Sequence, residues 1–186
     1  ASLADKGGAR MMEEGHTRKY VAVDVEEFCS NRIRKLQETE EWLRRNAPER
    51  RTAEEGYITI EGEHNIVDKV KHLLSSARER AYVVCACEQL PLFEKELEAL
   101  AASGRKTVLL TDREFPLAGE QVKVYPDMQE GNQIGVIVDS RSALTGEMGP
   151  DSRNTCLYSG QKNFVELYKR ALANEIELLK YRKGEK

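Results

Sequence analysis

Apolar residues recur at two different spacings along the chain, and the spacing predicts where helices and strands lie. From residue 24 to about residue 45 the spacing is three or four, which predicts a long helix. Asp24 suits the N-cap position, and Glu26 and Glu27 follow in the first turn, where the helix dipole favours negative charge. The apolar positions of this helix are Val25, Cys29, Ile33, Leu36 and Leu43.

These five positions form a narrow stripe, which suits contact with one partner helix, as in a coiled coil. Glu40 interrupts the stripe, and Trp42 beside Leu43 would widen it. The same pattern is typical of a helix that packs on its own domain. Both interpretations stay open, because three heptads are few.

Residues 1–23 predict the end of a helix followed by a β-hairpin. Gly7 and Gly8 mark a helix stop after "SLADKGG". Two short runs then flank Glu14-Gly15-His16, which is typical of a hairpin turn. An exposed polar hairpin explains this pattern by itself. Its basic residues are Arg10, His16, Arg18 and Lys19.

Pro48 and the polar residues around it predict a linker over residues 48–56, where the composition of the chain changes. Beyond it, short apolar strands alternate with amphipathic helices, which predicts an α/β domain whose sheet is covered on both faces. We expect Asn65 to cap the first of these helices. The expected strands are residues 56–62, 81–87, 106–112, 121–126, 134–139, 142–147 and 155–159, and the expected helices are residues 64–80, 90–104 and 161–181.

Composition excludes several classes of protein. The 186 residues are 40% hydrophobic and 33% charged with a formal net charge of −3, so the whole chain exerts no general attraction on nucleic acid or on a membrane. No apolar run approaches the roughly 20 residues that cross a bilayer, and no signal peptide opens the chain. We therefore expect a cytoplasmic protein. Because the sequence begins at Ala1, we also expect a fragment of a longer protein.

The four cysteines are scattered, and three of them lie in apolar stretches, so we expect reduced thiols and no disulfide framework. Cys85 and Cys87 form a Cys-x-Cys pair, which on a strand places both thiols on one face. Cys156, on a strand expected to be a neighbour, is the candidate third ligand for a metal or thiol-sensor site. Cysteine is also a common core residue, and we favour packing, with no metal and no cofactor.

Ligands of open α/β sheets bind beyond the carboxyl ends of the strands. This rule predicts an effector pocket around residues that follow the central strands. The carboxylate of Asp112 suits a turn in "TDREFP" equally well. The glycine-bearing loop "TGEMGPDSRNT" is a candidate cover for a ligand. The expected pocket residues are Cys87, Glu88, Thr111, Asp112, Arg113 and Asn132.

The stretch "GNQIGVIVDSRSALTGE", residues 131–147, resembles the His-x-Lys-x4-Asp segment of phospholipase D-type enzymes. Asp139 takes the aspartate position, and the strand, turn and Thr-Gly ending fit as well. Asn132 stands at the position of the nucleophilic histidine and Ile134 at that of the phosphate-binding lysine. An amide forms no phospho-enzyme bond and an isoleucine neutralises no phosphate, so the resemblance implies the scaffold without its catalysis.

A phospholipase D-like domain without this histidine and lysine, preceded by a helix and a basic hairpin, resembles the TrmB-type transcriptional regulators. "SLADKGGARMMEEGHTRKYVAVDVEEF" is similar to the end of their recognition helix and the wing, and "GEHNIVDKVKHLLSSARERAYVVCA" to the opening of their effector domain. The resemblance implies a mixed α/β sheet flanked by helices. It divides the chain into a winged helix-turn-helix remnant (1–23), a dimerisation helix (24–47), a linker (48–56) and a phospholipase D-like effector-binding domain (57–186).

The resemblance further implies a homodimer that binds DNA and an effector without turnover, and does not bind membranes. Arg10, His16, Arg18 and Lys19 would contact DNA phosphates. Most of the winged helix is missing, and the chain ends after one phospholipase D-like unit, so a sugar effector does not follow. One alternative is a divergent phosphodiesterase or nuclease that holds a metal with Asp112 and Glu88. Another is a thiol sensor.

Overall fold

The computed structural model describes residues 2–15, 17–48, 56–126, 128 and 131–182. The chain divides into two compact units, residues 1–50 and 51–186. The predicted linker, residues 48–56, spans this division, and its residues 49–55 lie outside the described part of the chain. Each unit is described separately below.

The first unit opens with hydrogen-bonded turns that end at two glycines. Gly8 N–H donates to Leu3 O at 2.8 Å and Gly7 N–H to Ala4 O at 2.9 Å, while Gly7 has a φ of 78°. This pair of bonds is the Schellman motif with which helices commonly end, so the predicted glycine stop is present. An antiparallel hairpin follows, formed by β1 (Ala9–Glu14) and β2 (Thr17–Ala22).

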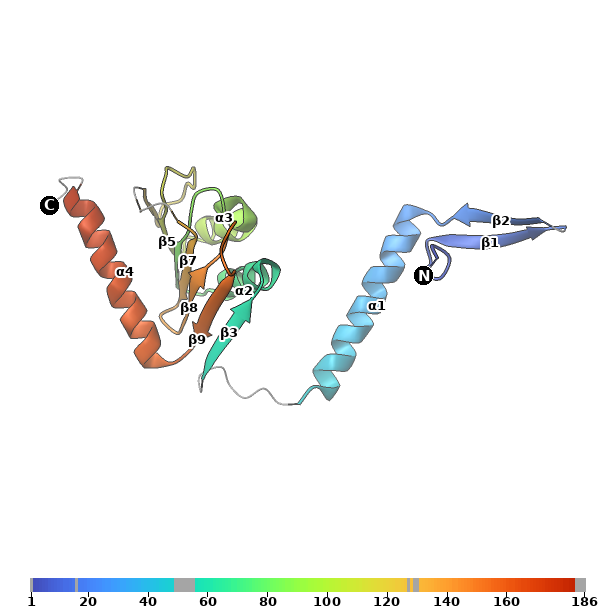
Figure 1. The fold of residues 1–186 in the computed structure, drawn as a ribbon, viewed down its shortest axis with the longest axis horizontal. Coiled ribbons are helices and arrows are strands. Elements are labelled where there is room, and N and C mark those ends of the chain that lie inside the picture. Colours follow the sequence, from blue (N-terminus) through green and yellow to red (C-terminus); the bar gives the residue numbers. More distant parts are fainter. Residues whose placement is uncertain (1, 16, 49–55, 127, 129–130, 183–186) are drawn as a thin grey trace. The chain divides into compact units, whose positions relative to one another are not determined.

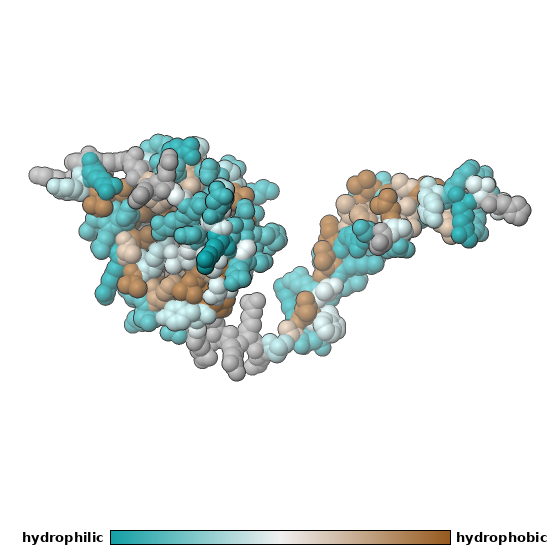
Figure 2. All heavy atoms as spheres, viewed as in Figure 1, coloured by the Kyte–Doolittle hydropathy of each residue, from teal (hydrophilic) through white to brown (hydrophobic). Residues whose placement is uncertain are grey.

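Helix α1 (Val25–Asn46) starts where its N-cap residue predicts. The Asp24 carboxylate accepts hydrogen bonds from the backbone N–H groups of Glu26 and Glu27. None of the residues of α1 is buried, and the brown apolar residues along it lie at the surface in Figure 2. The exposed fraction of Val25 is 75% and that of Leu36 is 70%. The apolar stripe of α1 therefore has no packing partner within this unit.

The second unit is built on a seven-stranded mixed sheet (Figure 1). Strands β4, β5 and β6 are parallel to one another, while β7, β8, β9 and β3 continue the sheet with antiparallel neighbours. The strand order is β3-β9-β8-β7-β4-β5-β6. The strands are β3 (Tyr57–Glu61), β4 (Arg80–Val84), β5 (Lys106–Leu110), β6 (Val122–Tyr125), β7 (Gln133–Val138), β8 (Ser142–Glu147) and β9 (Thr155–Ser159).

Helices cover both faces of this sheet, as the apolar strands predict. One face of the sheet, on which the odd-numbered residues of β4 lie, is covered by two helices and a 3₁₀ turn. These are α2 (Glu63–Ser76), η2 (Leu90–Phe93) and α3 (Glu94–Ala102). On the other face, α4 (Lys162–Arg182) packs against the even-numbered residues of β4. No helix of the described residues is long and apolar enough to cross a membrane.

Three local expectations were wrong. Gly62, and not Asn65, occupies the N-cap of α2, and the Asn65 amide donates back to Glu61 O at 2.8 Å. Helix α2 ends at Ser76, four residues early, because the backbone from residue 77 is extended and soon joins β4. Strand β4 stops at Val84, because the chain turns at its carboxyl end.

Helix α4 approaches the sheet closely at Gly135 of β7. A Cβ atom at this glycine would lie 1.6 Å from the hydroxyl oxygen of Tyr168 on α4. Only glycine therefore leaves room for this side chain between the helix and β7. Burial raises the pKa of the Tyr168 hydroxyl above its usual range. This contact fixes the amino-terminal half of α4 against the sheet.

Asp139, the aspartate of the phospholipase D-like segment, has a structural role at the end of β7. Its carboxylate accepts three hydrogen bonds of 2.8 to 2.9 Å from the backbone N–H groups of residues 78–80. These bonds join the β7–β8 turn to the segment between α2 and β4. Desolvation by itself would raise the pKa of Asp139, but the three hydrogen bonds outweigh it and lower the pKa.

We predict that Asp139→Ala lowers the free energy of unfolding by about 2 to 3 kcal/mol, measured by urea denaturation. The loss has two sources: removal of a charged acceptor from three N–H groups, and the cost of alanine at a φ of 51°. Asp139→Asn should cost less, because the amide keeps one acceptor oxygen and asparagine tolerates positive φ.

The pH dependence of the free energy of unfolding gives a second test of the role of Asp139. A folded-state pKa below the unfolded value means that the Asp139 carboxylate stabilises the fold above about pH 4 and loses this effect as the pH falls through the folded pKa. The slope of stability between pH 3 and 5 should therefore be smaller in Asp139→Asn. Asp151→Ala is the control, because Asp151 also has a positive φ, of 62°, but no side-chain hydrogen bond to a described residue. An equal loss in both alanine variants would contradict the role of the carboxylate.

Candidate functional site

The carboxyl ends of β4 and β5 are joined by a buried carboxylate. The side chain of Asp112, which is 4% exposed, accepts a hydrogen bond of 2.6 Å from the backbone N–H of Cys87. The Thr111 hydroxyl lies 3.3 Å from the same carboxylate oxygen, and Arg113 Nε lies 2.8 Å from the other. Four of the six predicted pocket residues thus lie together at this edge of the sheet.

Asp112 is held in its charged form. Desolvation would raise its pKa, but the hydrogen bonds from Cys87 N–H and Arg113, with the positive charge of Arg113, outweigh this effect and lower the pKa. Both carboxylate oxygens are occupied by these neighbours. The carboxylate therefore fixes the two loops relative to each other, through a bond to Cys87 that lies outside the turn "TDREFP".

Asn132 and Ile134, at the histidine and lysine positions of the phospholipase D-like segment, are both part of the scaffold. The Asn132 side-chain amide donates to Pro150 O at 2.9 Å, and the backbone carbonyl of Asn132 accepts from Met148 N–H at 2.7 Å. Ile134 is fully buried in the core under α2 and α3. Where a phosphoryl-transfer enzyme of this fold needs a nucleophile and a cation, this chain has a loop anchor and a core residue.

The loop of residues 148–154 forms one side of a cavity of about 550 Å³ beside Asn132. Two predicted residues belong here: Glu88 lines the cavity, and Asn132 holds the loop. The other lining side chains were missed, although the loop was recognised as a candidate cover. They are Glu63, Gln89, Leu92, Met148, Asp151 and Asn154, with Gly149 and Pro150 of the loop.

Gln89 connects the loop to the 3₁₀ turn before α3. It is 5% exposed, and its amide nitrogen donates to Met148 O. A Cβ atom at Gly149 would lie 2.7 Å from the Asn132 side-chain oxygen and 3.2 Å from the Gln89 amide nitrogen. Glycine at 149, with a φ of 144°, is therefore required for this approach. The Gln89 side-chain oxygen has no hydrogen-bond partner among the described residues.

Three carboxylates, those of Glu63, Glu88 and Asp151, line this cavity, and no Lys or Arg does. The electrostatic environment therefore repels a phosphodiester and suits a ligand that donates hydrogen bonds. The alternative of a metal held by Glu88 and Asp112 would use a carboxylate whose two oxygens already accept hydrogen bonds from Cys87 and Arg113. Among the described residues no group of three or more His, Cys, Asp or Glu side chains is arranged to hold a metal ion.

The cysteines do not form the site that the Cys-x-Cys pattern allowed. Because β4 ends at Val84, Cys85 and Cys87 lie beyond the strand, and the same-face argument was wrong. Cys156 on β9 is separated from β4 by β8 and β7, so it is not on a neighbouring strand. Burial raises the pKa of Cys85 to about 12 and that of Cys156 to about 11. Neither thiol forms a reactive thiolate near neutral pH.

The hairpin carries its basic residues at the surface, but in contact with carboxylates. Exposed ion pairs of this kind are worth little and leave the cations able to exchange partners. His16 lies outside the described residues. Arg10 contacts Glu27, Arg18 approaches Glu13 at 3.6 Å, and Lys19 contacts Glu14.

Comparison with known proteins identifies the family of the second unit. Residues 56–168 match the family described as "Transcriptional regulator TrmB, EBD N-terminal subdomain". The archaeal chromatin protein TrmBL2 superposes with a TM-score of 0.51 and 17% identity, covering 94% of this chain and 77% of that one. No curated protein sequence matches.

Two further solved structures are similar to the second unit. NucT from Helicobacter pylori superposes with a TM-score of 0.52 and 13% identity, over 66% of this chain and 97% of that one. Nuc from Salmonella typhimurium, a phospholipase D family member, gives a TM-score of 0.48 and 12% identity, over 64% of this chain and 93% of that one. The second unit therefore shares its fold with NucT, and its mixed α/β sheet flanked by helices is the one that the sequence predicts.

Thiol reactivity tests the placement of the cysteines. In a Cys29→Ser chain, we predict that Ellman's reagent at pH 8 labels one thiol, that of half-buried Cys87, and two more only after unfolding. A pKa of about 12 leaves roughly 1 in 10⁴ of the Cys85 thiol groups ionised at this pH, besides the steric protection. Rapid labelling of Cys85 in the folded chain, identified by mass spectrometry, would revive the thiol-sensor hypothesis.

Proposed function

The chain belongs to the TrmB family of transcriptional regulators, and we propose that its second unit binds a small effector without turnover while α1 pairs two protomers. This proposal rests on one observation: Asn132 and Ile134 both have structural roles. One anchors the loop over the cavity and the other fills the core, so the residues that would perform phosphoryl transfer are absent from their positions.

We further propose that the effector occupies the carboxyl-edge cavity, defined here as the space of about 550 Å³ lined by Glu63, Glu88 and the loop of residues 148–154. Three carboxylates and two side-chain amides line it, so it offers mainly hydrogen-bond acceptors. The chemistry that fits is an uncharged molecule rich in hydroxyl groups, or a small cation. Phosphate esters are disfavoured by charge.

The coupling that we propose runs through dimer packing. An effector changes the activity of a regulator only if it binds one arrangement of the protomers more tightly than another. Paired half-sites on DNA match a two-fold symmetric protein. In this proposal the hairpin lies beside DNA as a wing, where Arg10, Arg18 and Lys19 exchange their carboxylate partners for phosphates. TrmBL2, the similar archaeal chromatin protein, is described as binding DNA.

A hydrolysis assay and a thermal-shift screen together distinguish an effector-binding protein from a phosphodiesterase. We predict that the 186-residue chain does not hydrolyse bis(p-nitrophenyl) phosphate, with or without divalent metal ions. In a thermal-shift screen of neutral sugars, polyols and amines, we predict that at least one compound raises the unfolding temperature.

The matched variants are Glu88→Gln, at the cavity, and Glu98→Gln, an exposed glutamate of α3 outside it. The apparent affinity derived from the thermal shift should fall at least tenfold in Glu88→Gln. It should stay unchanged in Glu98→Gln. Hydrolysis that is lost in Glu88→Gln or Asp112→Ala would instead establish the enzyme alternative.

Pairing through α1 is tested at the centre of its exposed stripe. We predict that Leu36→Glu weakens dimerisation at least tenfold, measured by sedimentation equilibrium, because burying a leucine contributes about 1.5 to 3 kcal/mol per protomer. Gln37→Glu adds the same charge at the next residue and should leave the dimer intact. Equal effects of the two variants, or a monomeric wild-type chain, would contradict this role of α1.

A further inference from the structure

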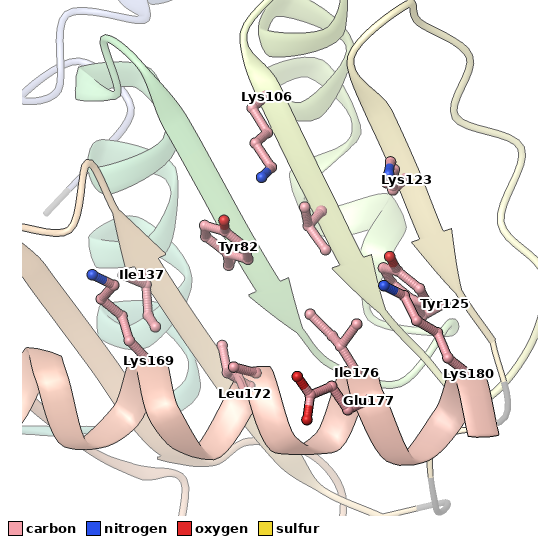
Figure 3. A pocket seen from close by; sticks show the side chains of 12 residues that line it. Tyr82, Lys106, Lys123, Tyr125, Ile137, Lys169, Leu172, Ile176, Glu177 and Lys180 are labelled. Atoms are coloured by element: carbon pink, nitrogen blue, oxygen red, sulfur yellow. The ribbon is translucent and has the colours of Figure 1, made fainter. Parts of the chain in front are cut away.

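A second cavity, of about 340 Å³, lies on the opposite face of the sheet between α4 and strands β4 to β7 (Figure 3). We call it the α4 cavity. Its floor is apolar and includes Val108, Ile137 and Leu172, each buried. Its volume falls within the usual range for small-molecule sites. It has no part in the function proposed above.

Lysines line this cavity because of the strand register. Side chains alternate between the faces of a sheet, so Lys106, Val108 and Leu110 of β5 point to the α4 face. On β6, Lys123 lies opposite Val108 and Tyr125 opposite Leu110, which places them on the same face. Two lysines therefore interrupt a face that is otherwise apolar and covered by α4.

Helix α4 adds two more lysines on its side of the cavity, Lys169 and Lys180, and one acidic group, Glu177. Figure 3 shows the Glu177 carboxylate rising from the helix toward the sheet and the Lys106 ammonium group directed toward Tyr82. The Lys106 nitrogen lies 5.8 Å from the centre of the Tyr82 ring. The lining thus combines four cations, one anion and two phenol rings.

The positive charge of this lining is only partly compensated. Lys169 contacts Glu166 at 3.2 Å, but no ion pair joins Lys106, Lys123 or Lys180 to another described residue. This local excess of cations occurs in a chain whose net charge is −3. Lys106, Lys123 and Lys180 are exposed residues, and an anion placed among their like charges reduces the repulsion between them.

We propose that the α4 cavity binds an organic phosphate with a flat ring. The ammonium groups of Lys106, Lys123 and Lys180 supply the charge for the phosphate, and charge-assisted hydrogen bonds of this kind are the strong ones. The rings of Tyr82 and Tyr125, with the apolar floor, supply the surface for the ring of the ligand. The two cavities of the domain therefore select opposite kinds of ligand.

Lysines on an edge strand also prevent edge-to-edge pairing of sheets, and Lys123 on β6 fits that purpose by itself. This explanation does not extend to Lys180, which lies on a helix and lines the same cavity as Lys106. What Lys106, Lys123 and Lys180 have in common is that they line the same cavity, and not that they lie on an edge strand.

The test uses 1-naphthyl phosphate as the probe, and 1-naphthol and inorganic phosphate as its two halves, titrated calorimetrically into the 186-residue chain. We expect 1-naphthyl phosphate to bind at least tenfold more tightly than either half, with an affinity that falls as salt is raised. A Lys106→Gln/Lys180→Gln chain should lose at least tenfold in affinity, which corresponds to about 1.4 kcal/mol.

The matched control is Lys95→Gln on α3, on the other face of the sheet, which should bind as the wild type does. A thermal unfolding transition measured for each variant serves to check that it folds. The proposal is overturned if 1-naphthol binds as tightly as its phosphate, if Lys95→Gln weakens binding equally, or if 1-naphthyl phosphate does not bind at millimolar concentration. Glu88→Gln should leave probe binding unchanged, so this result and that for the carboxyl-edge cavity are independent.

Discussion

Helices cover both faces of the seven-stranded sheet, and this constraint decides where polar chemistry can occur in the domain. A side chain in the middle of β7 must be apolar, because both faces of this central strand are buried. Ile134 satisfies this requirement at the position where phospholipase D-type enzymes carry a lysine. The charged side chains of the strands therefore lie near the two ends of the strands or on the edge strand β6.

The three locations have different roles. At the amino end of β4, the Asp139 carboxylate holds backbone N–H groups and stabilises the fold. At the carboxyl ends, Asp112 fixes two loops, while Glu63, Glu88 and Asp151 make the adjacent cavity acidic. At the covered edge, lysines make the second cavity cationic. The aspartate of the phospholipase D-like segment thus has a structural role in this fold, while Asn132 anchors a loop and Ile134 fills the core.

The first unit leaves the apolar stripe of α1 exposed. A single helix of 22 residues with its apolar stripe exposed gains little from packing, and helices in water depend mainly on such packing. Its N-cap, its first-turn acids and the pairs Arg44–Glu40 and Arg45–Glu41 support the helix locally. These local interactions do not cover the stripe, and a second copy of the same helix would cover it.

The periodicity of apolar residues determined most of the architecture: the hairpin, the long helix capped by Asp24, the alternation of strands and helices, and a sheet covered on both faces. These features depend on neighbouring residues, which the sequence displays directly. The sequence also placed Asn132 and Ile134 at the histidine and lysine positions of the phospholipase D-like segment, because spacing alone identifies them. The tertiary structure decided where β4 ends, that Cys156 is three strands away from it, and that Asp139 bonds to residues 78–80. The tertiary structure also decided where the two cavities lie, because their linings bring together residues that are far apart in the chain. Such contacts depend on strand order and helix placement, which the spacing of residues along one sequence does not encode.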